Sequence, residues 1–314
     1  MNLVNRAEIA RSYDILVERF VKWAQPRSDV RAAFIIGSRA RQDRPADEWA
    51  DLDVVVITTN AEHYVLTSDW VKNMGKLLLT FIEPTSAGDE KERRVLYDGM
   101  LDVDFAIFPF EKARLIQREK ESSQLAAQLA NAFGRGMRVL IDKDNLLSDL
   151  KKTLPPSTKA SPEVPTQTEF LSVVNDFLYH TVWTAKHLLR GELWWADSCC
   201  NCRLSQLMLK MMEWHVQTEH DWKYDTWFRG RFLEQWTDQQ ILEELKATFT
   251  HYDEQDTRKA LFAALNMFRR IATQTAKKLG YDYPEDEDRR IREWLITLLS
   301  DFEKKDSLGC RDGR

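Results

Sequence analysis

A proline-rich stretch near the middle of the chain constrains its fold more than any other feature. Residues 151–168 hold four prolines among serines and threonines, and they lack the apolar side chains that a core needs. Short runs rich in Val, Ile and Phe precede it, whereas the pattern after it is helical. The sequence therefore predicts domains at 1–150 and 169–303, a linker at 151–168 and a polar tail at 304–314. A chain of 314 residues is long enough for two cores.

The predicted fold class is α+β, with a mixed sheet and helices in the first half and an all-α bundle in the second. Strands are expected at residues 32–36, 52–57 and 101–108, with a short one within 138–147. Apolar side chains at helical spacing predict helices at 5–24, near 68–79, within 111–135, and at roughly 169–191, 194–218, 227–247, 254–279 and 286–303.

Composition argues against some classes of partner. The 45 Lys and Arg residues against 50 Asp and Glu residues give a formal charge of -5, so no basic excess predicts binding to nucleic acid or anionic lipid. We find no apolar run long enough for a membrane span and no signal peptide, so a cytoplasmic protein is expected. The four cysteines lack the paired spacing of zinc sites, and packing in a reduced protein is the expected role.

Two aspartates on a predicted strand are the first chemical signal. Asp51 and Asp53 alternate with Leu52 and Val54, so both carboxylates lie on one face of the strand. Carboxylates this close repel each other, and one takes up a proton unless a cation lies between them. The pair therefore predicts a site for a divalent metal.

A third strand and a Gly-Ser pair complete this pattern. Asp102 and Asp104 lie on the face opposite Val103 and its apolar neighbours, so Asp104 is placed to join the first two acids. Three carboxylates with substrate phosphates and water suit Mg²⁺. Gly37-Ser38 directly follows the first strand, where its backbone N–H groups and hydroxyl are suited to hold anionic oxygens.

A strand, Gly-Ser, a polar loop, Asp-x-Asp and a later acid form the signature of the nucleotidyltransferase superfamily. Within it, the chain resembles the aminoglycoside 6-adenylyltransferases, also called streptomycin adenylyltransferases. In the first half the resemblance rests on GSRA at 37–40, DEWADLDVVV at 47–56, DFAIFP at 104–109 and VLIDKDNLL at 139–147. In the second half it rests on NDFLYHTVWTAKHLLRGEL at 175–193, MMEWHV at 211–216 and ALFAALNMFRRIATQTAKKLGYDYP at 260–284.

The resemblance implies transfer of AMP from ATP to a hydroxyl of an aminoglycoside, with Mg²⁺. Streptomycin is the first acceptor to consider, and such a modification confers antibiotic resistance. Asp51 and Asp53 would hold the metal, and Gly37, Ser38 and Arg39 would hold the triphosphate. Asp104 would complete the metal site or take the proton from the attacking hydroxyl. A carboxylate bound to Mg²⁺ is a poorer base, and the sequence does not separate these two roles.

The second half offers candidates for binding the nucleotide and the acceptor. Lys186, within the family-like AKHLLRGEL, is the candidate for a phosphate contact, with a solvated lysine as the alternative. Asp176 would face a cationic group of the drug, unless it is an ordinary acid on a helix surface. Trp183 belongs to a tryptophan-rich segment in which most rings are expected in the core and one or two beside the drug.

Other readings remain open from the sequence. The same Gly-Ser pair and aspartates suit transfer to another small molecule or to a protein hydroxyl, and a catalytically inactive relative would also bind nucleotide. RNA extension is disfavoured because neither half has a basic groove. No sequence feature distinguishes a monomer from a homodimer, one metal from two, or one drug hydroxyl from another.

Overall fold

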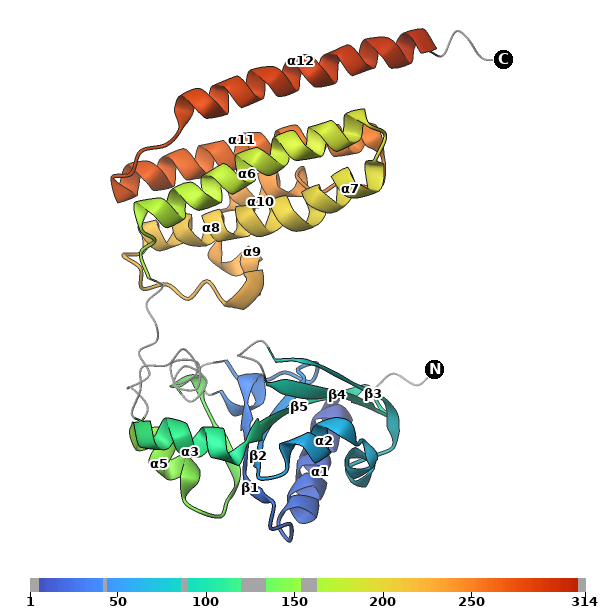
Figure 1. Ribbon diagram of the computed structural model, residues 1–314, viewed down its shortest axis with the longest axis vertical. Helices are drawn as coiled ribbons and strands as arrows, with labels where there is room; N and C mark the ends of the chain where they lie inside the picture. Colours follow the sequence, from blue (N-terminus) through green and yellow to red (C-terminus); the bar gives the residue numbers. More distant parts are fainter. Residues whose placement is uncertain (1–5, 42–43, 86–89, 120–133, 154–162, 310–314) are drawn as a thin grey trace. The chain divides into compact units, whose positions relative to one another are not determined.

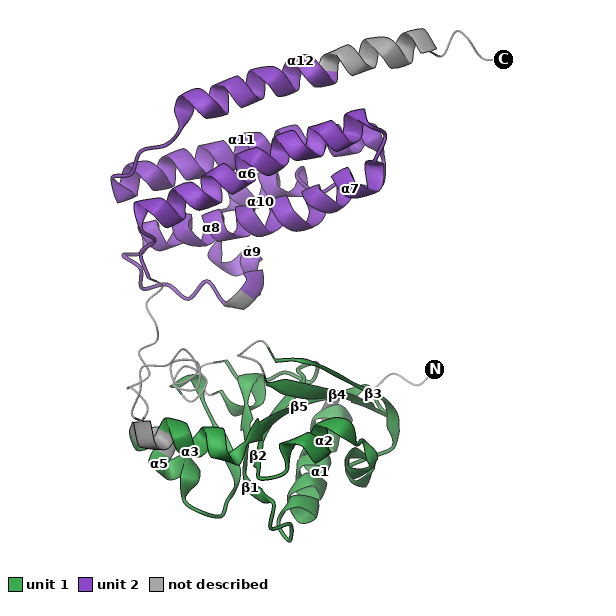
Figure 2. Cartoon of the chain, viewed as in Figure 1, with its two compact units in different colours: residues 1–160 green, residues 161–314 purple. Residues whose placement is uncertain are grey.

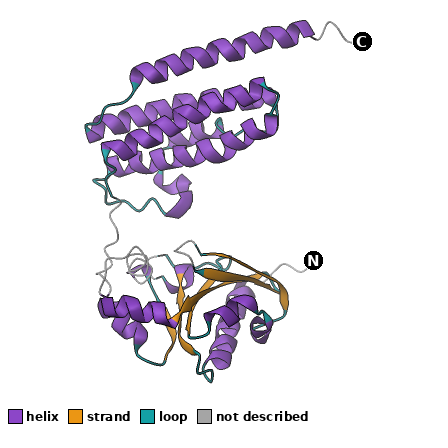
Figure 3. Cartoon of the chain, viewed as in Figure 1, coloured by secondary structure: helices purple, strands orange, loops and turns teal. Residues whose placement is uncertain are grey.

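The computed structural model describes residues 6–41, 44–85, 90–119, 134–153 and 163–309 (Figure 1). The chain forms two compact units, residues 1–160 and 161–314 (Figure 2). Their boundary falls within the proline-rich stretch. Among the described residues, strands occur in the first unit and the second is helical (Figure 3), so the predicted fold class is confirmed. A search of the described helices finds none with the length and hydropathy needed to cross a membrane.

The first unit is built on a six-stranded sheet with the order β3-β4-β5-β2-β1-β6. Parallel pairing joins β2 to β5, and the other neighbouring strands are antiparallel. This one parallel pair brings two segments about 50 residues apart into direct register. The strands are β1 (Val30–Ile36), β2 (Leu52–Thr58), β3 (Leu77–Pro84), β4 (Lys91–Tyr97), β5 (Leu101–Pro109) and β6 (Arg138–Asp142).

Helices cover both faces of this sheet. On one face, α1 (Arg6–Ala24), α2 (Ala61–Leu66) and the 3₁₀ segment η2 (Asp69–Asn73) bury Leu52 and Val54 in the larger core. On the other face, α3 (Phe110–Glu119) and α5 (Leu146–Thr153) pack over Val55 and Ile57. Alternate residues of β2 thus belong to two cores, one on each face of the sheet. On the second face, Asp53 precedes Val55, so an acid lies at the end of the apolar row.

Two strands and one helix differ from the sequence-based expectation. A helix near 68–79 was expected, but the segment forms the short η2 and then the start of β3. The hairpin of β3 and β4 was not predicted, because β4 reads KERRVLY and its charges hide the alternation. Arg93 is 4% exposed and donates to the Tyr64 carbonyl and to Thr80 Oγ1, at 3.3 and 3.2 Å, which satisfies its buried guanidinium.

The second unit is a helical bundle with its own core. Phe177 on α6 stacks on Phe268 on α11 with centroids 3.7 Å apart, and Met208 and Met211 of α8 complete the centre. Thr166 and Glu169 form a capping box that starts α6. The helices are α6 (Gln167–Leu189), α7 (Leu193–Ser198), α8 (Ser205–Glu219), α9 (Leu233–Trp236), α10 (Gln239–Lys246), α11 (Glu254–Leu279) and α12 (Glu285–Gly309).

Two predicted helices of this unit are interrupted. The expected helix at 194–218 consists of α7, the π-helical segment η3 (Cys199–Leu204) and α8. The expected helix at 227–247 is broken because Trp227, Arg229 and Phe232 adopt positive φ, and only α9 and α10 remain helical. Helix α12 continues to Gly309, past the expected start of the polar tail.

Candidate active site

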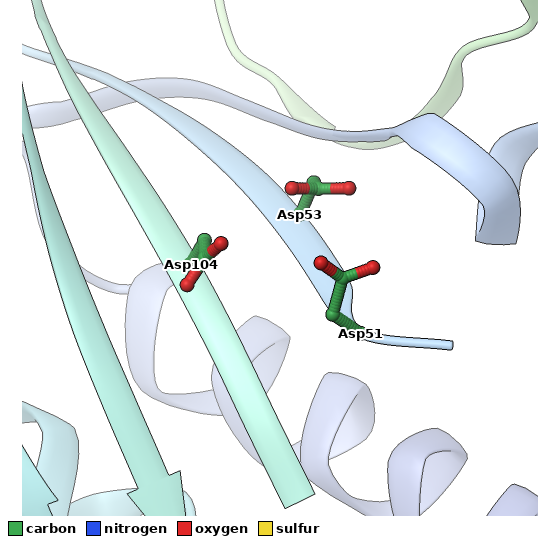
Figure 4. A group of neighbouring side chains, drawn as sticks. All are labelled: Asp51, Asp53 and Asp104. Carbon is green, nitrogen blue, oxygen red and sulfur yellow. The ribbon is translucent and has the colours of Figure 1, made fainter. Parts of the chain in front are cut away.

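The structure brings together the three aspartates singled out in the sequence. Asp53 on β2 pairs in parallel register with Asp104 on β5, and Asp51 directly precedes β2. One carboxylate oxygen from each lies within 4.8 Å of the others. Their side chains project from the same side of the two strands (Figure 4). Asp53 and Asp104 are therefore placed by the strand register, and Asp51 by its position directly before β2.

Burial and mutual repulsion raise the pKa of two carboxyl groups in this acid group. Burial raises the pKa of Asp53 to about 7, and the nearby carboxylates of Asp51 and Asp104 add to the rise. Burial also raises the pKa of Asp104 to about 7, against the opposing effect of the Arg94 guanidinium. Two groups that ordinarily ionise near pH 4 are thus partly protonated at neutral pH.

The donor set fits a hard divalent cation. Three carboxylates, on or directly beside two neighbouring strands, supply oxygen ligands of the kind that Mg²⁺ prefers. Their raised pKa values show that the chain holds them together at an electrostatic cost, which a dication would relieve. On this observation the residues present fit a metal.

The Gly-Ser turn lies against the same acids. Gly37 has φ of +71°, and a Cβ at this position would lie 2.2 Å from Asp53 Oδ2. Both the backbone conformation and the available space therefore require glycine. The segment Gly37–Ala40 forms a short 3₁₀ turn, η1, that carries the chain away from β1 beside the acid group.

Ser38 is an unsatisfied polar group at the edge of a cavity. Its Oγ is buried and has no hydrogen-bond partner within the part of the chain that the structure describes. A cavity of about 220 Å³ on the α1 face of the sheet is lined by Ser38, Arg39, Tyr13 and Leu52, among other residues, and none of the three acids lines it. A buried hydroxyl without a partner carries a desolvation cost, which a ligand that accepts its hydrogen would remove.

Arg39, expected to hold phosphate, makes several contacts within the protein. Its Nε donates to the carbonyl oxygens of Ala50 and Asp51 at 3.2 and 3.0 Å, and NH2 donates to that of Ala50 at 2.5 Å. The guanidinium lies 3.6 Å from the ring centroid of Tyr13. These contacts hold the backbone at Ala50 and Asp51, and phosphate binding by Arg39 stays a prediction. Tyr13 in turn donates to Asp102 Oδ1 at 2.8 Å, and Asp102 stands outside the acid group.

Three charged residues beside Asp104 were missed by the sequence reasoning. The guanidinium of Arg94 contacts Asp104, Glu83 on β3 and Glu92 on β4. Glu92 and Arg94 are two residues apart on β4, so their side chains lie on the same face of the sheet. This alternation points to the pair only if the segment is known to be a strand, and the sequence did not predict β4.

The candidates of the second unit lie on α6. Asp176 Oδ1 lies 2.6 Å from His180 Nδ1, and Arg203 contacts its other oxygen. Trp183 is half-buried against His187 and Trp195, with ring centroids 3.8 and 5.5 Å away. Lys186 is exposed. Asp176 is therefore already paired with the Arg203 guanidinium and contacts the His180 ring, and the ring cluster forms a part-exposed aromatic surface.

The family model described as streptomycin adenylyltransferase matches residues 10–298. An aminoglycoside 6-adenylyltransferase of Bacillus subtilis (strain 168) is 24% identical over 281 residues, covering 88% of this chain and 94% of its own. One of Campylobacter jejuni is 22% identical over 289 residues, covering 90% and 93%. The crystal structure of an aminoglycoside 6-adenyltransferase from Bacillus subtilis aligns with a TM-score of 0.43 at 20% identity, covering 90% of this chain and 97% of that one. Because the family model spans most of the chain, the predicted resemblance is confirmed: the chain belongs to the streptomycin adenylyltransferase family and is a nucleotidyltransferase enzyme.

Proposed function

We propose that this enzyme transfers AMP from ATP to a hydroxyl of an aminoglycoside in a Mg²⁺-dependent reaction, with streptomycin as the first acceptor to test. The observation that carries the chemistry is the convergence of three carboxylates beside the Gly37 turn. The acceptor class is proposed from the names of the relatives, which are aminoglycoside 6-adenylyltransferases.

In this proposal Asp51, Asp53 and Asp104 hold the metal. A bound Mg²⁺ supplies positive charge that offsets the charge on phosphate oxygens during transfer. The protein's part is positioning: Gly37 lets the backbone come close to Asp53, and Arg39 fixes the carbonyl of Asp51. Positioning of this kind accounts for most of the catalysis expected in phosphoryl-group transfer.

Asp104 is also the candidate to take the proton of the acceptor hydroxyl. Its pKa of about 7 belongs to the metal-free protein and a metal bound directly to it would lower that pKa, so the base role requires a carboxylate oxygen that is free of metal. Its Oδ2 is held by Arg94, which leaves its other oxygen as the candidate for a ligand or base role. A general base contributes about 10²–10⁴ in rate, so Asp104→Asn is expected to lower kcat by at least that factor.

Nucleotide binding is proposed to begin at the Gly-Ser turn. Ser38 Oγ has a hydrogen bond to give, and a phosphate oxygen is the acceptor that the turn's backbone amides also favour. Lys186, exposed on α6, remains our proposal for a second phosphate contact. A lysine serves this purpose as a point charge, which needs less exact geometry than an arginine fork.

The acceptor is proposed to contact Trp183 and Asp176. An aromatic ring offers an apolar face to a sugar ring, and a carboxylate attracts a cationic substituent of the drug. Asp176 is ion-paired with Arg203, so a cationic group of the acceptor would compete for that carboxylate. This predicts that the Asp176→Asn variant raises KM for the acceptor with KM for ATP unchanged.

The test is pyrophosphate release from ATP, followed across a panel of aminoglycosides and lincosamides with and without Mg²⁺. Release that requires streptomycin and Mg²⁺, and that is lost in Asp53→Ala, is the expected result. Asp98→Ala is the matched control, because Asp98 is an exposed acid that pairs with Lys76 outside the acid group. Nucleotide binding without release for any acceptor would contradict the proposal and favour an inactive nucleotide-binding protein.

A further inference from the structure

The guanidinium of Arg94 binds three different carboxylates, one through each nitrogen. Nε lies 2.5 Å from Glu83 Oε1, and NH2 lies 2.7 Å from Glu92 Oε1. NH1 contacts Asp104 Oδ2, the member of the acid group on the neighbouring strand. Each nitrogen of the guanidinium therefore has a carboxylate partner, and the three contacts use three of its five N–H donors.

Strand register explains why a cation is needed at this position. Glu83 lies directly opposite Glu92 in the β3–β4 pairing, and like charges directly opposite on antiparallel strands repel each other. Arg94 lies directly opposite Asp104 in the β4–β5 pairing. The side chains of Glu92 and Asp104 are only 14% and 9% exposed, so water screens their charges weakly. Arg94 thus lies where a positive charge offsets the repulsion among Glu83, Glu92 and Asp104.

We propose that Arg94 is a resident cation of the acid group, and that it makes metal binding by this enzyme depend on the nucleotide. This inference rests on the proposed metal role of Asp51, Asp53 and Asp104. A fixed positive charge held on Asp104 disfavours a second cation at the same acids. Nucleotide phosphates add negative charge and oxygen ligands, and these overcome the repulsion. The enzyme would therefore take up its metal together with the nucleotide, and bind little metal alone.

Metal binding to the full chain tests this directly. Mn²⁺ is titrated into the metal-free protein and followed by calorimetry, first alone and then with an ATP analogue that has a methylene bridge between the α and β phosphates. Arg94→Met removes the charge and keeps most of the side-chain length, whereas Arg94→Lys keeps the charge. Arg31→Met is the matched control, because Arg31 pairs with Asp144 at the end of β1 remote from Gly37.

The expected result is Mn²⁺ binding without nucleotide that is roughly tenfold tighter in Arg94→Met, from removal of one charge close to a dication. Arg94→Lys and Arg31→Met should bind Mn²⁺ as the unmodified protein does. The analogue should strengthen Mn²⁺ binding by a smaller factor in Arg94→Met than in the unmodified protein. The metal-free Arg94→Met protein should have a lower Tm than the unmodified protein. Addition of Mn²⁺ should raise the Tm of the variant by more than it raises that of the unmodified protein.

Equal or weaker Mn²⁺ binding by Arg94→Met would overturn the inference and would leave Arg94 as a structural support for the hairpin. If this variant does not fold, Arg94→Gln also removes the charge while keeping hydrogen-bond donors, and the same expectation applies to it. The proposed function has a separate failure: Mn²⁺ binding with the analogue that is absent, or that is unchanged by Asp53→Asn, would show that these acids hold no metal.

Discussion

Replacing Gly37 with alanine is expected to disable the acid group while leaving the first unit folded. The new Cβ would lie 2.2 Å from Asp53 Oδ2, and the next nearest atom to it would be Asp53 Cγ, at 3.3 Å. The clash is therefore with the end of one side chain, which is free to move. Restoring an ordinary contact requires a displacement of the carboxylate by about 1 Å.

The expected magnitude has two parts. Alanine in the left-handed conformation that Gly37 adopts costs about 1 kcal/mol of stability, which lowers Tm by about 2–4 °C in a unit of this size. Moving a metal-site carboxylate by 1 Å costs about 100-fold in activity. The loss of activity should therefore far exceed what the small loss of stability would explain.

Gly280→Ala separates these two parts. Gly280 ends α11 with the same φ of +71°, and a Cβ there meets nothing within 4 Å. This control should show a similar loss of stability with unchanged pyrophosphate release. Both variants are compared by thermal melting and by steady-state kinetics at saturating Mg²⁺. Activity of Gly37→Ala within threefold of the unmodified enzyme would refute the claim that the turn and the acid are in contact.

Three further predictions concern stability and specificity. Because burial and neighbouring carboxylates raise the pKa of Asp53 to about 7, the metal-free folded protein retains a proton that the unfolded chain loses near pH 4, and stability falls as pH rises between these values. Asp53→Asn should therefore raise Tm at pH 8 by more than at pH 4, and a pH-independent change would contradict this. Trp183→Ala should raise KM for the aminoglycoside and leave KM for ATP unchanged in steady-state kinetics; equal effects on both would argue against an acceptor contact. Arg269→Met leaves the fully buried carboxylate of Asp288 without its ion pair at 3.0 Å and should cost about 3 kcal/mol in urea unfolding, whereas a loss below 1 kcal/mol would show that Asp288 is held by other groups.

The parts of the site carried by hydrophobic alternation were predictable from the sequence. The apolar residues Leu52 and Val54 indicate which face of β2 is buried in the core, so Asp51 and Asp53 are predicted on the opposite face. The same argument holds for Asp104 on β5. Gly37 follows from its position after a strand, since a turn with positive φ favours glycine.

The β3–β4 hairpin was not predictable from a single sequence, for a physical reason. Charged residues occupy both faces of β4 and find their partners on other elements: Arg93 donates to the backbone carbonyls of 64 and 65, and Arg94, on the opposite face, pairs with Asp104. On β3, Leu78 and Phe81 are about half exposed, so apolar character does not report burial there. Cross-strand ion pairs replace the hydrophobic pattern, and such pairs are visible only once the register is known.

Arg39 makes contacts that its residue type alone does not specify. A basic residue directly after Gly-Ser suggests a phosphate ligand, which stays a prediction, and in the structure its guanidinium also donates to the carbonyl oxygens of Ala50 and Asp51. Residue type gives the chemistry available, and the fold decides which acceptor lies within reach. The broken helix at 227–247 is a similar case, because its positive-φ residues are not glycines apart from Gly230.

The direct pairing of Asp53 with Asp104 makes strand length a determinant of activity in its own right. A slip of one residue between β2 and β5 would set Asp53 beside Phe105 or Val103, and would force apolar and acidic side chains to exchange sides of the sheet. Substitutions that keep the buried side chains of these two strands apolar and similar in volume preserve the register, whereas a single insertion or deletion within either strand would separate the two carboxylates. Divergence in this enzyme is accordingly expected to accumulate as residue replacements inside β2 and β5 and as length changes outside them.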